Sequence, residues 1–392
     1  MQPIYLDCHA TTPVDERVYD AMKPYFCDRF GNPSSVHPYG WEAQSAVKLA
    51  RNTIAEAINA TPEEIIFTSG ATEANNLAIK GIAEAYFAQG KHIITVATEH
   101  RAVLDPCKYL ESLGFEVTYL PVKSDGLIDL PTLSSAIRSD TILVSVMAAN
   151  NEIGVLQPLT EIGNICREQE VLFHTDAAQA IAKIPLDVQK MQIDLMSLTA
   201  HKVYGPKGIG ALYLRRRPKV KIAPQLQGGG QERGIRSGTL YPPQIVGFAK
   251  AVEIGMEVME TESKYLGKLR SHLWCNLQSL PGIHLNGHLD RRLPGNLNVS
   301  IEGVDGAALL LGLNSTVALS SGSACSAAST TPSHVLTALG RNKKLAYASL
   351  RFGIGRFNTT EEITLVAEEV QKTVSALRQA NSWQPKALAN NL

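Results

Sequence analysis

The sequence predicts an α/β protein in which a large domain, built on a mostly parallel, seven-stranded sheet covered by helices, is joined to a smaller α+β domain. Two observations lead to this fold class. Short β-rich segments alternate with helical segments through the first two thirds of the chain, as in a parallel sheet with helices on both faces. After about Pro242 the alternation stops, and a long helical stretch over residues 244–280 precedes a mixed region of strands and helices.

The predicted strands of the large sheet are residues 65–68, 92–97, 116–120, 141–147, 171–175, 195–199 and 210–214. Helices are expected over residues 73–88, 159–169, 244–280 and 360–379, and a strand of the small domain over 297–301. We expect residues 14–258 to form the large domain. Residues 1–13 and 259–392 would form the small domain, with a Gly/Ser-rich loop at about 320–330 and a poorly ordered tail from residue 380.

Composition excludes several classes of function. The 37 Lys and Arg residues balance 37 Asp and Glu residues, which gives no electrostatic footprint for nucleic acid. No apolar run approaches the ~20 residues that span a bilayer, and the N-terminus lacks a secretory signal. The six cysteines, at positions 8, 27, 107, 166, 275 and 325, show no zinc-binding spacing. We therefore expect a cytoplasmic protein without a membrane span, a nucleic-acid partner or a metal site.

Two segments place polar groups directly after predicted strands. In IIFTSGATEANN (65–76) a glycine-containing turn leads into a helix near Thr72, and the free N–H groups at such a start can bind a phosphate. An ordinary turn with a threonine cap explains the same pattern. In VLFHTDAAQA (171–180) Asp176 closes a strand, where a carboxylate could pair with a protonated ring nitrogen or could cap the next helix.

Two further residues are candidate reactive groups. Lys202 lies between the apolar segment 195–199 and a glycine-rich turn, where desolvation favours the neutral amine that forms a Schiff base. A lone lysine of this kind also occurs as an ordinary surface residue. Cys325 lies among small residues in ALSSGSACSAAST (318–330), so its thiol is either a loop nucleophile or incidental.

Together, these segments resemble the cysteine desulfurases of the NifS/IscS type, which are pyridoxal-phosphate enzymes with the class V aminotransferase fold. The resemblance covers nearly the whole chain. The matching stretches are YLDCHATTP (5–13), GNPSSVH (31–37), TSGATEANN (68–76), TEHRAVLD (98–105), NNEIGV (150–155), HTDAAQA (174–180), HKVYGPKGIGALY (201–213), GGGQERGIRSGT (228–239) and SSGSAC (320–325).

The resemblance implies an enzyme that converts L-cysteine to L-alanine and leaves a persulfide on Cys325 for a sulfur acceptor, such as an iron–sulfur scaffold protein. Lys202 would hold the cofactor as a Schiff base and then move the Cα proton. Asp176 would pair with the ring nitrogen, Gln179 would bond the ring hydroxyl, and His100 would stack on the ring and assist proton transfer.

The remaining roles that the resemblance implies concern the cofactor phosphate and the substrate. The residues for the phosphate are Ala71, Thr72, Thr199 and His201, with Thr239 reaching the partner subunit of a homodimer. The residues for the substrate are Arg351, which would grip the carboxylate, Asn32 and Asn151, the last of which would also hold the cofactor ring. Cys8 and His9 replace the residues common in relatives, and we assign them no role.

Three other interpretations of the function remain open. A selenocysteine lyase could use the same thiol and pocket, whereas another class V aminotransferase would need no loop thiol. A non-catalytic scaffold for sulfur-transfer proteins would not need the set Lys202, Asp176, His100 and Arg351.

Overall fold

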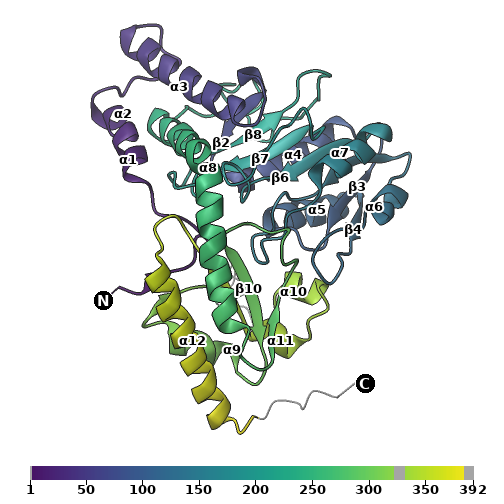
Figure 1. Ribbon diagram of the computed structural model, residues 1–392. Coiled ribbons are helices and arrows are strands. Elements are labelled where there is room, and N and C mark those ends of the chain that lie inside the picture. The colour runs from purple at the N-terminus through teal and green to yellow at the C-terminus, as the bar shows by residue number, and fades with distance from the viewer. Residues whose placement is uncertain (1, 322–331, 384–392) are drawn as a thin grey trace.

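The computed structural model describes residues 2–321 and 332–383 (Figure 1). Its centre is a seven-stranded sheet in the order β2-β8-β7-β6-β5-β3-β4. The strands are β2 (Ile65–Thr68), β3 (His92–Val96), β4 (Glu116–Leu120), β5 (Thr141–Ser145), β6 (Leu172–Asp176), β7 (Leu195–Thr199) and β8 (Gly210–Leu214). Strand β8 runs antiparallel to its two neighbours, β2 and β7, and the other paired strands of this sheet are parallel. The predicted fold class is confirmed, and β3, β5 and β6 differ from the predicted strands by one or two residues at their ends.

Both faces of the large sheet are buried because side chains along each strand alternate between two apolar cores. Ile66 packs in one core with α4 (Ala71–Ala85) and α5 (Arg101–Ser112). Its neighbours Ile65 and Phe67 pack in the other core with α3 (Pro38–Glu56), α7 (Leu159–Glu168) and the first half of α8 (Pro242–Leu277).

Helix α8 is 36 residues long and contributes to two separate cores. Its first half buries Ile245, Phe248 and Val252 beneath the large sheet. Its second half buries Leu269, Leu273 and Leu277 in a core with the smaller sheet. Figure 1 shows the helix crossing from one part of the molecule to the other.

The smaller sheet contains β9 (Ile283–Leu285), β10 (Asn296–Ile301) and β12 (Ser349–Gly353), with β10 in the middle. The N-terminal strand β1 (Ile4–Tyr5) pairs with β11 (Val317–Ala318), so the start of the chain packs beside its last third. The predicted domain boundaries themselves stay a prediction.

The other helical elements are α1 (Glu16–Met22), α2 (Pro24–Cys27), η1 (Pro62–Glu64), α6 (Leu130–Ala136), α9 (Gly306–Leu313), α10 (His334–Ala338), α11 (Lys343–Tyr347) and α12 (Thr360–Ala380). Over the two described ranges, no helix combines the length and apolar character needed to cross a membrane. The predicted tail beyond residue 383 lies outside the described residues.

Candidate active site

A cavity of about 560 Å³ opens at the carboxyl edge of the large sheet. Strands β2, β5, β6 and β7 run in one direction, so the loops after them meet at this edge, where open α/β sheets bind ligands. The size is ordinary for a small-molecule site. The predicted site residues in its lining are Ala71, Thr72, His100, Asn151, Asp176, Gln179, Thr199, His201, Lys202 and Arg351. Residues far apart in the sequence are thus brought together.

Among the described residues, two predicted site residues do not line this cavity. Asn32 is exposed and accepts a 2.9 Å hydrogen bond from the Ser34 N–H, outside the cavity lining. Thr239 is also exposed and does not line the cavity. Cys325 lies outside the described residues. The roles of these three residues therefore stay predictions.

One corner of the cavity can bind an anion. Helix α4 begins at Ala71, and its N-cap residue, Gly70, offers no side-chain hydrogen bond, so backbone N–H groups of the first turn remain available to a ligand. The hydroxyls of Thr72 and Thr199 also line the cavity. Burial, helped by the nearby Lys202 charge, lowers the pKa of His201 to about 4, so its imidazole is neutral at pH 7. These groups suit a phosphate.

Asp176, the last residue of β6, is a buried carboxylate with partners on both oxygens. Its Oδ2 accepts a 2.7 Å hydrogen bond from Asn75 Nδ2, and its Oδ1 accepts one of 2.9 Å from the Ala178 N–H. The remaining lone pairs of the two oxygens can accept a hydrogen bond from a ring N–H. Asn75 lies on α4 and is completely buried. The sequence analysis missed it, although a buried amide on an apolar helix face is a usable signal.

Lys202 follows β7 and is half-buried in the cavity wall, close to His100. Burial lowers the pKa of His100, against the charge of Asp176. The ring Nδ1 accepts a 3.1 Å hydrogen bond from the Ala102 N–H at the start of α5, so a neutral ring carries its proton on Nε2. The cavity therefore presents an amine and a neutral imidazole with a defined proton.

Arg351 on β12 supplies the cation of the site and is 1% exposed. Its Nη2 forms a 2.7 Å ion pair with Asp7 Oδ1, and its Nη1 donates to the Asn151 carbonyl at 2.9 Å. Within the described ranges its Nε–H has no acceptor. A buried guanidinium donor in a cavity suits a carboxylate ligand. No local sequence pattern pointed to Asp7.

The residues that flank segment 322–331 are anchored near the cavity. The Ser320 carbonyl accepts from the Arg351 N–H at 2.9 Å, and its hydroxyl donates to Asp7 at 2.9 Å. On the other side, the Ser333 hydroxyl donates to Glu152. Glu152 is buried, and burial raises its pKa to about 7.

Gln179 forms part of the cavity wall and contacts His9, a residue with no role in the sequence analysis. Its Nε2 donates to the His9 carbonyl at 2.8 Å, and its Oε1 lies 3.4 Å from His9 Nδ1. Burial lowers the pKa of His9 well below its ordinary value, so this ring is neutral.

The chain belongs to the class-V aminotransferase family, whose model matches residues 4–366. Curated relatives of high similarity are cysteine desulfurases. The mitochondrial cysteine desulfurase of Arabidopsis thaliana is 56% identical over 380 residues, which is 96% of this chain and 84% of the relative. The cysteine desulfurase IscS of Neisseria meningitidis is 54% identical over 384 residues, 97% of this chain and 95% of the relative.

Solved structures agree with these relatives. A NifS-like protein superposes with a TM-score of 0.89 at 39% identity, covering 96% of this chain and all of that one. A structure described as SspA in complex with cysteine superposes with a TM-score of 0.81 at 41% identity, covering 91% of this chain and all of that one.

Proposed function

We propose that this chain is a cysteine desulfurase that uses pyridoxal phosphate to take sulfur from L-cysteine and release L-alanine. The observation that carries the proposal is one cavity that combines Lys202, Asp176 and the buried Arg351. Both flanks of the segment that contains Cys325 are anchored beside the same cavity. The relatives named above, which are cysteine desulfurases, support the same reaction.

The residues fit the cofactor group by group. The anion-binding corner would hold the phosphate, and Asp176 would pair with the ring nitrogen. Lys202 would hold the aldehyde carbon, Gln179 would bond the ring hydroxyl, and His100 would pack on the ring; all of these residues line the cavity. When bound, the cofactor withdraws electrons from the Cα atom of an amino acid and so makes its proton acidic.

Arg351 orients the substrate. Its guanidinium, which lines the cavity, would bind the α-carboxylate of L-cysteine, while Asp7 and the Asn151 carbonyl keep it in place. Asn32 and the Asn151 side chain remain proposed substrate contacts.

Proton and sulfur transfer are divided between two residues. The Lys202 amine removes the Cα proton, with His100 as the neighbouring imidazole. The Cys325 thiolate forms an S–S bond to the substrate sulfur while the bond from that sulfur to Cβ breaks. The electron pair of the broken bond stays with Cβ, which takes up a proton, and the three-carbon product leaves as alanine. Cys325 keeps the persulfide and passes it to an acceptor such as an iron–sulfur scaffold protein.

We place the protein in a homodimer, in which Thr239 reaches the cofactor phosphate of the partner subunit. The exposure of Thr239 in the single chain supports a contact outside that chain.

The test is Cys325→Ser, with Cys275→Ser, an exposed free cysteine, as the matched control. After incubation with L-cysteine, mass spectrometry should find one added sulfur on the Cys325 peptide of the wild type and of the control. Cys325→Ser should keep the yellow cofactor and lose alanine and sulfide formation. Unchanged turnover of cysteine by Cys325→Ser would falsify the role of this thiol.

A second variant separates the enzyme from a non-catalytic scaffold. Lys202→Ala should abolish both the covalent attachment of the cofactor and alanine formation. A protein with no visible absorption band at saturating pyridoxal phosphate contradicts the whole proposal.

A further inference from the structure

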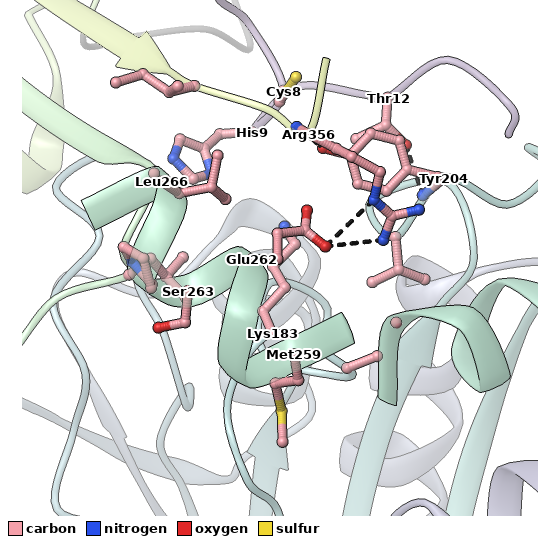
Figure 2. Close-up of a pocket in the computed structure, with 17 residues that line it drawn as sticks. Cys8, His9, Thr12, Lys183, Tyr204, Met259, Glu262, Ser263, Leu266 and Arg356 are labelled. Atoms are coloured by element: carbon pink, nitrogen blue, oxygen red, sulfur yellow. Dashed lines mark hydrogen bonds and ion pairs between the residues drawn. The ribbon is translucent and has the colours of Figure 1, made fainter. Parts of the chain in front are cut away.

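A second, small pocket lies behind Gln179, between helix α8 and the N-terminal segment. Its lining includes Cys8, His9, Lys183, Glu262 and Arg356 (Figure 2). His9 lines both this pocket and the cavity described above, and Gln179 lines the cavity while bonding to Lys183. The Gln179 side chain thus lies between the site and the half-buried Lys183, whose amine the proposed reaction does not use.

The amine of Lys183 bonds an amide oxygen rather than an acid. Its Nζ donates to Gln179 Oε1 at 3.3 Å. Glu262, an acid in the lining of the same pocket, is paired at 2.9 Å with Arg356 (Figure 2). Among the described residues, no carboxylate forms an ion pair with Lys183. Keeping an amine in such surroundings is unfavourable, which argues for a role in the site.

The hydrogen bonds around Gln179 select one orientation of its carboxamide. A lysine amine in its charged form only donates, so it must meet the oxygen and not the NH₂ group. The His9 carbonyl only accepts, and it takes one of the two N–H donors at 2.8 Å. The second N–H of Gln179 is left for the cavity that the residue lines. A flipped amide would place donors against Lys183 and an acceptor against the His9 carbonyl.

We propose that Lys183 is a positioning residue, which fixes the Gln179 carboxamide so that an N–H group faces the ring hydroxyl of pyridoxal phosphate. The inference rests on the proposed function. An N–H donor stabilises the ionised ring oxygen, whereas a carbonyl in its place would repel it. Lys183 thereby tunes the acidity of the bound cofactor without touching it.

The charged and titratable groups around the Lys183 amine are Cys8, His9, Lys202 and Glu262, the last paired with Arg356. Burial raises the pKa of the Cys8 thiol to about 12 and lowers that of His9, so both are neutral near pH 7. Burial, with the Lys202 charge, lowers the pKa of Lys183 itself to about 8. The amine is therefore mostly charged at neutral pH.

The experiment is a pH titration of the visible absorption band of the cofactor-loaded protein. In Lys183→Met, the midpoint should rise by about half to one pH unit, because the ring oxygen loses an oriented donor. Lys190→Met, an exposed lysine on the same connection after β6, should leave the midpoint unchanged. If Lys183→Met does not fold, Lys183→Leu provides the same comparison.

A double-mutant cycle with Gln179→Ala tests whether Lys183 acts through the amide. In the Gln179→Ala background, the Lys183→Met shift should fall to less than about a third of its size. An equal shift in both backgrounds, or no shift in either, overturns the inference while leaving the proposed function intact. A wild-type protein that takes up no cofactor overturns both.

Discussion

Glu152 makes the stability of the fold depend on pH near neutrality. Its side chain is 5% exposed, and its carboxyl accepts a hydrogen bond from Ser333. Burial raises its pKa from 4.5 to about 7, against the opposing effects of the Ser333 bond and the Arg351 charge. The perturbation is Glu152→Gln, which keeps the shape and removes the titration.

The direction of the pH dependence follows from which state, folded or unfolded, binds the Glu152 proton more tightly. The folded protein binds it more strongly than the unfolded chain, so the contribution of Glu152 to stability is full below about pH 4.5 and is lost as the pH rises through about 7. Integrated between about pH 5.5 and about pH 8.5, the wild type should lose about 2 kcal/mol of unfolding free energy relative to Glu152→Gln.

The assay is urea unfolding of both proteins across this pH range, at equal protein and cofactor concentrations. Glu260→Gln, a substitution of an exposed carboxylate, is the matched control. Its unfolding free energy should change with pH in the same way as that of the wild type. If the unfolding free energies of the wild type and of Glu152→Gln also change with pH in parallel, Glu152 does not titrate in this range. Burial then does not raise its pKa to near neutrality.

Three further substitutions test the site and its support. Arg351→Lys should reduce kcat/KM for L-cysteine by about 10- to 100-fold, because the guanidinium fork is lost; unchanged kinetics would exclude it as the carboxylate contact. Asn75→Ala removes the 2.7 Å bond to Asp176, and a cofactor titration should show roughly tenfold weaker binding; equal affinity would count against this support. Gly154→Ala, at φ +71° with a Cβ 2.4 Å from the Asn296 side chain, should lower the unfolding free energy by more than about 1 kcal/mol, and an unmoved urea midpoint would contradict this.

The sequence predicted the large sheet well because burial on both faces gives its strands short, continuous apolar runs. It also placed Asp176 and Lys202 at the carboxyl ends of such strands, and both line the cavity, while their roles stay predictions. It could not predict the partners of these groups. Asp7 and Arg351 form an ion pair across most of the chain length, and no local pattern links them. Lys183 is four residues from Gln179, but only the folded turn shows that its amine meets the amide oxygen.

The length of helix α8 limits how far the two sheets can move relative to each other when a substrate binds. At 1.5 Å per residue its 36 residues form a rod about 54 Å long, and each end is embedded in a different core. Turning the sheet that bears Arg351 against the sheet that bears Lys202 would require this rod to bend. The fold therefore sets the spacing between the Arg351 guanidinium and the Lys202 amine, and under the proposed function this spacing would select an amino acid whose carboxylate and Cα match it.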